Sequence, residues 1–133
     1  MSQVLIRSGK AEDKDFVMSS WLKAVYWGST SYSNMDQTEY FTDYAKHIAK
    51  LITRPGTKVD VAVLKEDQNE VLSYIVYNDQ VLYFAYTKRD FRKAGMLNTL
   101  LKDMDFTHVH VLTKIGKVIA DKKELKYNPF LET

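Results

Sequence analysis

The chain has 133 residues, 45% hydrophobic and 27% charged, with a formal net charge of +2, which predicts one globular domain over 1–133. The absence of cysteine excludes disulfides, cysteine-ligated zinc and thiol catalysis, and it is consistent with a cytoplasmic location. The charge is too small to indicate nucleic-acid binding, and the polar N-terminus and short apolar runs predict neither a secretory signal nor a membrane span.

The first half of the chain predicts one strand and two helices. Val4–Arg7 is a short apolar strand, and Glu12–Trp27 follows it as a helix with apolar residues at helical spacing. Gly28–Asp36 is rich in small polar residues and predicts a loop. Gln37–Thr53 predicts a second amphipathic helix, because its apolar residues again follow a period near 3.6 and Pro55 comes directly after it.

Three strands with short polar turns come next. The apolar, β-branched and aromatic runs Val59–Leu64, Val71–Tyr77 and Val81–Thr87 are separated by the turns Glu66–Asn69 and Asn78–Asp79. Turns this short predict an antiparallel meander. Because both faces of the second and third runs are apolar, we expect helices on both sides of the sheet.

The last part of the chain alternates helices with strands. Ala94–Met104 predicts a helix with one apolar face, Thr107–Leu112 a strand, Lys114–Lys123 a helix, and Leu125–Phe130 a strand or extended tail. The fold class is therefore α/β with a mixed sheet, in the element order β-α-α-β-β-β-α-β-α-β.

The segment that joins the Val81–Thr87 strand to the next helix has the properties of an anion site. It is basic over Lys88–Lys93 and contains Gly95, whose lack of a Cβ atom lets a ligand approach the backbone. The first N–H groups of a helix have no acceptor within the helix, and Arg92 would add a full charge. An ordinary helix start with a solvated basic turn would have the same local sequence, so both interpretations stay open.

The spacing Arg92-x-x-Gly95-x-Leu97, together with the element order, resembles the Gcn5-related N-acetyltransferase (GNAT) family. The resemblance implies that acetyl-CoA is the cofactor and that the 81–87 and 106–112 strands are parallel and splay apart into a cleft. It implies that backbone groups of Ala85, Tyr86 and Thr87 hold the pantetheine. The residues expected to bind the pyrophosphate are Arg92, Lys93, Ala94, Gly95, Met96, Leu97 and Asn98.

The resemblance also concerns the proton donor. Many members of that family carry Asn-x-x-Ala-x-x-x-Tyr on the last helix, where the tyrosine protonates the leaving thiolate. In this chain Ala120 occupies the position of that tyrosine, and Tyr127 is the nearest substitute. The other interpretation of Tyr127 is a packed tyrosine with its hydroxyl at the surface.

A narrower resemblance comes from the C-terminal part. The segments Phe106–His108, Thr113–Lys117 and Lys126–Phe130 are similar to GNAT-like proteins of tailed bacteriophages and prophages. This implies a phage-encoded acetyltransferase-like protein of the host cytoplasm with no assigned substrate. The leading hypothesis is an enzyme that acetylates an amine of a protein or small molecule. The alternative is a catalytically inactive protein on the same fold that binds a host or virion protein.

Two further patterns are candidate sites. His108 and His110 alternate on one strand and could bind a metal, but no third ligand stands at a suitable spacing, so we predict no metal site. The lysines of the last predicted helix are expected to form a solvated face rather than a nucleic-acid contact.

Overall fold

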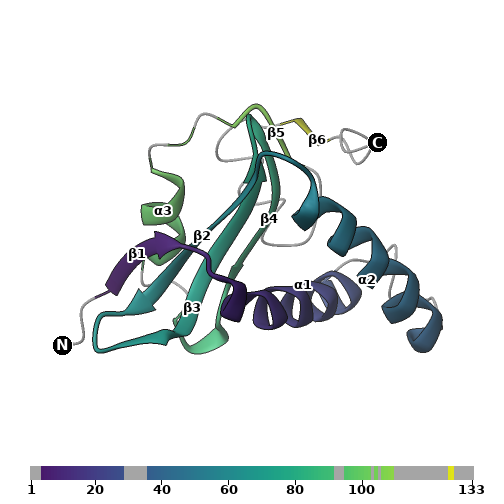
Figure 1. Cartoon of the computed structure of the whole chain (residues 1–133), viewed down its shortest axis with the longest axis horizontal. Coiled ribbons are helices and arrows are strands. Elements are labelled where there is room, and N and C mark those ends of the chain that lie inside the picture. Colours follow the sequence, from purple (N-terminus) through teal and green to yellow (C-terminus); the bar gives the residue numbers. More distant parts are fainter. Residues whose placement is uncertain are drawn as a thin grey trace.

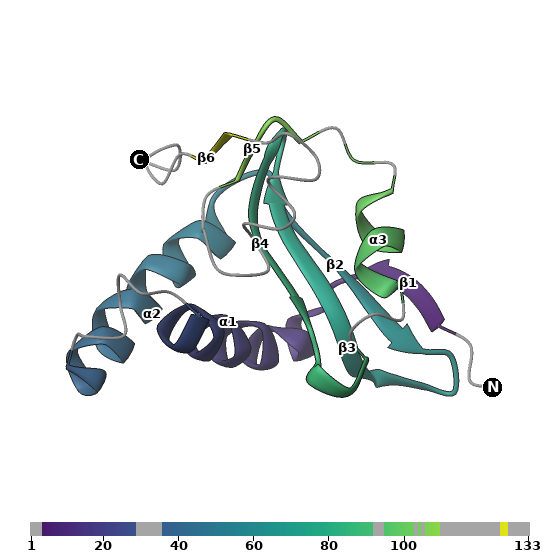
Figure 2. The same ribbon diagram turned by 180° about the vertical axis from the view of Figure 1, so that it is seen from behind.

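The computed structural model describes residues 4–28, 36–91, 95–102, 104, 106–109 and 126–127. Within them, helices lie on both faces of one six-stranded sheet with strand order β1-β2-β3-β4-β5-β6 (Figure 1). Helices α1 and α2 cover one face and α3 covers the other, as the reverse view in Figure 2 also shows. The predicted mixed sheet with helices on both sides is confirmed. None of the helices in these residues is long and apolar enough to cross a membrane.

The sheet changes from antiparallel to parallel pairing at β4. Strands β1 to β4 pair antiparallel, whereas β5 is parallel to β4 and β6 is parallel to β5. The strands are β1 (Val4–Ser8), β2 (Thr57–Leu64), β3 (Asp67–Asn78), β4 (Val81–Thr87), β5 (His108–Val109) and β6 (Lys126–Tyr127). Because the turns between β2, β3 and β4 contain only two residues each, these three strands form two tight hairpins.

Local sequence explains where the long helices begin and end. The Asp36 side chain accepts a hydrogen bond from the Glu39 N–H at 3.0 Å, which caps the start of α2, and Pro55 follows its end. The helices are η1 (Ala11–Asp13), α1 (Lys14–Gly28), α2 (Gln37–Thr53), η2 (Arg89–Phe91) and α3 (Met96–Leu101).

The two faces of the sheet carry separate apolar clusters. On the α1 and α2 side, Trp21 is fully buried and its ring stacks on that of Phe84, with the centroids 5.0 Å apart. On the other side, Leu101 of α3 packs with Leu72 and Ile75 of β3. The alternation of side chains along β3 divides its apolar residues between the two clusters, so this strand forms the centre of the core.

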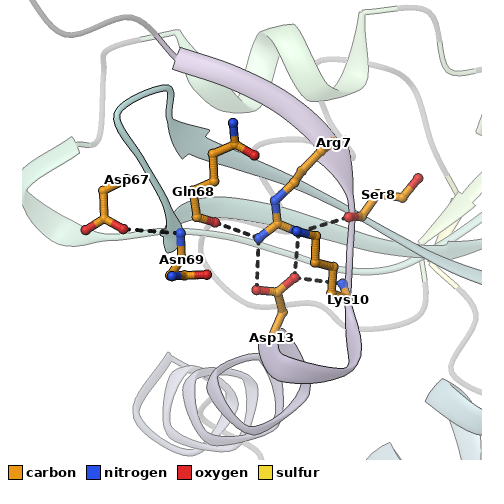
Figure 3. A network of polar contacts seen from close by, with 7 residues as sticks. All are labelled: Arg7, Ser8, Lys10, Asp13, Asp67, Gln68 and Asn69. Atoms are coloured by element: carbon orange, nitrogen blue, oxygen red, sulfur yellow. Dashed lines mark hydrogen bonds and ion pairs between the residues drawn. The ribbon is translucent and has the colours of Figure 1, made fainter.

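One polar network fixes the start of α1 to the sheet (Figure 3). The Arg7 guanidinium bonds to both carboxylate oxygens of Asp13 and donates to the backbone oxygens of Ser8 and Gln68. Asp13 also accepts from the backbone N–H of Lys10 at 2.7 Å. The network therefore joins β1, the first turn before α1 and the β2–β3 hairpin.

Several predicted boundaries were wrong. The helix expected over Glu12–Trp27 starts with the short η1, and α1 proper runs over Lys14–Gly28. The turn expected over Glu66–Asn69 is shorter, because β3 already starts at Asp67, opposite Leu64. The helix expected over Ala94–Met104 ends at Leu101, and Gly95 has a left-handed backbone that does not belong to it.

Other boundaries were predicted correctly. The structure has α2 at Gln37–Thr53 and β4 at Val81–Thr87, as expected. The predicted helix over Lys114–Lys123 and the end of the strand over Thr107–Leu112 lie outside the described residues. The predicted element order of the C-terminal part therefore stays a prediction.

Candidate functional site

Strand β4 has an outer edge that is only partly paired among the described residues. Its inner edge pairs with β3 along its whole length, from Asn78–Val81 to Ser73–Thr87. On the outer edge, β5 pairs only with Val81 and Leu82. Residues 110–112, in which the rest of the predicted fifth strand falls, lie outside the description, so the predicted splay of the two strands stays a prediction.

The register shows which backbone groups of β4 point toward this outer edge. The Lys88 N–H donates to the Leu72 carbonyl at 2.8 Å. Because hydrogen-bonded pairs alternate along an antiparallel ladder, Tyr86 directs its backbone groups to β3, while Ala85 and Thr87 direct theirs away from it. Two of the three predicted pantetheine-binding residues thus present a donor and an acceptor at the outer edge.

The side chains of these residues lie on alternate faces. Ala85 is buried on the α3 side. Tyr86 packs on the α1 side, where its ring centroid is 6.1 Å from that of Phe16. The Thr87 and Ser73 hydroxyls lie 2.8 Å apart, and Ser73 also donates to the Tyr86 carbonyl. These contacts hold the edge rigidly against β3.

A β-bulge interrupts β4 near its paired end. Val76 lies opposite Phe84 and Tyr77 lies opposite Leu82, so Tyr83 is the extra residue of the bulge, which the register with β3 skips. Tyr83 and Phe84 consequently both pack on the α1 side, although they are consecutive. Bulges of this kind redirect the strand locally and are frequent beside active sites.

Gly95 leads into α3 from the turn that follows β4. Its φ angle is +82°, in the left-handed region. Apart from its chain neighbours, no atom of the described residues lies within 4 Å of the position that a Cβ atom would occupy. Its carbonyl accepts from the Thr99 N–H at 3.0 Å and from the Thr99 hydroxyl at 2.9 Å. The open space beside this backbone is what the binding of a bulky anion at this turn requires.

The predicted pyrophosphate residues are described only in part. Met96 is buried and Leu97 is half-buried against the same apolar cluster, so both side chains fix α3 to the sheet. The backbone of Asn98 belongs to α3, but its side chain lies outside the description. Arg92, Lys93 and Ala94 lie outside it as well, so their predicted role stays a prediction.

Lys88, the first residue of the basic segment, is engaged elsewhere. Its ammonium lies 3.6 Å from a carboxylate oxygen of Glu70 and 5.2 Å from the ring centroid of Phe16. Phe16 lies near the N-terminal end of α1, and Glu70 lies near the start of β3. Lys88 therefore contributes to the contact between β4 and α1.

The predicted proton donor is placed by its backbone alone. Tyr127 pairs with Val109 in β6, and its side chain lies outside the description. The predicted position of the missing tyrosine, Ala120, is also outside. His108 Nδ1 lies 2.8 Å from the Thr107 hydroxyl, and among the described residues no group of three metal-binding side chains exists.

Tyr74 is a residue that the sequence reasoning missed. Its hydroxyl lies 2.7 Å from that of Ser20 and donates to the Val17 carbonyl at 3.0 Å, which joins β3 to α1 directly behind Tyr86. Burial raises the pKa of Tyr74 far above its ordinary value, although the Ser20 hydrogen bond partly opposes this. A tyrosine inside an apolar strand gives no sequence signal that it bonds to a helix.

Neither a protein-family model nor a curated protein sequence matches the chain. Several solved structures are similar to it. An acetyltransferase of the GNAT family from Staphylococcus aureus Mu50 shares 10% identity at a TM-score of 0.57, over 90% of this chain and 79% of its own. The structure of AAC(6')-Iy in complex with the bisubstrate analog CoA-S-monomethyl-acetylneamine shares 9% identity at a TM-score of 0.51, over 94% and 92%.

The apo form of YjaB from Escherichia coli is similar over 75% of this chain, with 18% identity and a TM-score of 0.52. The match spans 63% of the length of YjaB. At identities this low, the likeness establishes the fold. The chain has the GNAT acyltransferase fold, as the sequence predicted.

Proposed function

We propose that this protein is an N-acetyltransferase that transfers an acetyl group from acetyl-CoA to an amine. The observation that supports it best is the outer edge of β4, where the backbone groups of Ala85 and Thr87 point away from β3. Support also comes from the fold, which the chain shares with acetyltransferases, and from the open space beside Gly95.

The described residues fit such a cofactor. A pantetheine chain carries amide groups, and the backbone of Ala85 and Thr87 offers both a donor and an acceptor to them. A Cβ atom at Gly95 would project into the space that a pyrophosphate needs. Arg92 and Lys93 would neutralise its charge. When bound, the cofactor supplies an acetyl group activated as a thioester.

The chain's own part in the reaction is orientation and proton transfer. The bulge at Tyr83 and the ring stack of Trp21 on Phe84 hold the α1 side of β4 in place. The amine must lose a proton, and the departing thiolate must gain one. Because Ala120 occupies the family's tyrosine position, we assign the second proton to the Tyr127 hydroxyl.

The acceptor amine belongs to a protein or to a small molecule. The resemblance of the C-terminal segments extends the proposal to a phage-encoded enzyme acting in the cytoplasm of its host. One observation favours a second function: Ala120 and Leu97 both depart from the family pattern. On that basis the competing proposal is an inactive protein that uses the same fold to bind a host or virion protein.

Calorimetry of the purified protein with acetyl-CoA tests the proposal, followed by transfer assays on a panel of amines. We expect saturable binding, which Arg92→Ala weakens by about 1–2 kcal/mol because one charge-assisted contact is lost. Arg54→Ala is the matched control. It also removes one positive charge, but at the end of α2 and outside the turn, so the affinity should be unchanged.

The possible outcomes separate the two functions. Tight binding without transfer to any amine or to host lysate would overturn the enzyme and favour the binding protein. Equal losses in Arg92→Ala and Arg54→Ala would count against a pyrophosphate site at the turn.

A further inference from the structure

A cavity of about 620 Å³ lies along the outer edge of β2, at the point where β1 ends. Ser8 is the last residue of β1, opposite Asp60, and the Gly9 N–H then donates to the Val59 carbonyl at 2.7 Å. Beyond Gly9 the chain turns away into η1 and α1 (Figure 1). The start of β2 therefore has no neighbouring strand on that side among the described residues, and the cavity occupies the space.

The rim of this cavity is positively charged. Lys10, Lys14 and Lys58 line it with exposed side chains, and no ion pair of their ammonium groups exists among the described residues. Two acids also line the wall. Asp13 is paired with Arg7, whereas Asp60 keeps its negative charge and accepts a hydrogen bond from the Tyr77 hydroxyl at 2.9 Å. The three ammonium groups outnumber the two carboxylates, so the rim attracts an anion from outside.

The floor of the cavity is apolar. It is formed by Val17 of α1, Ile52 of α2 and Val59 of β2. A Cβ atom on Gly9 would lie 3.0 Å from Val59 Cβ, so only glycine lets the chain pass this close to the floor. A fully solvated ion would gain nothing from such a surface, whereas an anion with an apolar body would bury it there.

A second cavity, of about 390 Å³, shows the contrast. Its wall carries the acids Glu12, Asp13, Asp67 and Glu70 and the cation Lys88, whose ammonium lies against Glu70 and the Phe16 ring. The lining of the second cavity is therefore mainly acidic and unsuited to an anion, whereas lysines outnumber acids in the lining of the first.

We propose that the cavity beside β2 binds an amphipathic organic anion, a carboxylate or phosphate monoester on a short apolar chain or ring. The lysines select the anionic head by charge, and the valine and isoleucine floor accepts the apolar body. The site is separate from the outer edge of β4, because β3 lies between the two strands. It does not depend on acetyl transfer.

Four probes separate charge from apolar recognition in calorimetry: hexanoate, hexyl phosphate, inorganic phosphate and hexanol. We expect saturable binding of hexanoate and hexyl phosphate, weaker binding of inorganic phosphate and none of hexanol. Because the contacts are exposed ion pairs, binding should also weaken with added salt. The amide NMR signals of Gly9 and Lys14 should shift along with binding.

Matched variants locate the site. Combined Lys10→Gln, Lys14→Gln and Lys58→Gln should weaken hexyl phosphate binding about tenfold, as expected for three exposed charge contacts. Combined Lys23→Gln, Lys46→Gln and Lys50→Gln remove the same charge from exposed positions on α1 and α2 that do not line the cavity, and should leave the affinity unchanged.

Three results would overturn the proposal. The first is an equal loss of affinity in both triple variants. The second is hexanol or inorganic phosphate binding as tightly as hexyl phosphate. The third is loss of hexyl phosphate binding when acetyl-CoA is present in excess, which would place the ligand in the cofactor site and leave the proposed transferase intact.

Discussion

Arg7 of β1 and Asp13 before α1 are joined at two points, with Nη1–Oδ2 at 2.8 Å and Nη2–Oδ1 at 3.1 Å. Asp13 is only 6% exposed. Arg7 also donates to the Gln68 carbonyl, so it links β1 to the β2–β3 hairpin, which is distant in the sequence. Asp13 also lines the cavity beside β2.

Asp13→Asn should therefore lower the free energy of unfolding by about 3 kcal/mol, because it leaves the half-enclosed Arg7 without its counter-charge. Urea denaturation at neutral pH measures this loss. Asp15→Asn, in the first turn of α1 but exposed, is the matched control and should stay within about 0.5 kcal/mol of the parent. If the two changes lowered the free energy of unfolding equally, the Arg7–Asp13 pair would contribute no more than any acid at the start of a helix.

Low pH should remove the stabilisation that the Arg7–Asp13 pair provides. Burial raises the pKa of Asp13, but hydrogen bonds from Arg7 and Lys10 outweigh it and hold the pKa below its ordinary value of 3.8. The folded state therefore binds the proton less readily than the unfolded state. The stabilisation is complete above pH 3.8 and is lost as the pH falls below it. The difference between Asp13→Asn and the parent should shrink over that range.

Tyr74→Phe should lower the free energy of unfolding by about 1–2 kcal/mol, because the hydroxyl bonds of Tyr74 to Ser20 and Val17 are buried. A double-mutant cycle with Ser20→Ala measures the share that belongs to the pair. If the losses of unfolding free energy were additive, the hydrogen bond between the two hydroxyls would make no contribution of its own.

Gly95→Trp should abolish acetyl-CoA binding in calorimetry, since the indole would fill the open space beside the turn. The positive φ angle alone costs a non-glycine residue about 1–2 kcal/mol of stability. Gly56→Ala, at a φ of +88° after α2, carries the same kind of strain and is the matched control. Full cofactor affinity in Gly95→Trp would exclude the turn as a binding site.

Tyr127→Phe tests the proton donor. If its hydroxyl protonates the thiolate, turnover should fall about 10²–10⁴-fold with cofactor affinity nearly unchanged. Tyr77→Phe is the control, because that hydroxyl bonds to Asp60 of β2, away from the outer edge of β4. A rate unchanged by Tyr127→Phe would indicate that solvent supplies the proton.

Hydrophobic pattern predicted the central elements well and the site only in part. The seven residues of β4 were predicted from their apolar and aromatic character, and α2 from its periodicity and the following proline. The start of β3 was misjudged because Asp67, Gln68 and Asn69 are polar residues typical of turns. They extend the hairpin into solvent, where a strand needs no apolar side chains.

Features that depend on distant contacts could not be read from the sequence. The hydrogen bond from Arg7 to the Gln68 carbonyl forms only because the end of β1 meets the β2–β3 hairpin. Tyr40 is 1% exposed and donates to the Leu22 carbonyl across the α1–α2 interface, a contact between two helices that the sequence does not signal. The direction of the Ala85 backbone follows from register with β3, which composition does not encode.

The parallel pairing of β5 with β4 has a consequence for how the chain folds. The β2–β3–β4 hairpins close over turns of two residues and should form early, whereas β5 and β6 follow long connections and should join late. Until they do, the outer edge of β4 is exposed to other chains in the same state. The edge that we assign to the cofactor is then also the edge at which two unfinished molecules can pair, so recovery on refolding should fall as protein concentration rises.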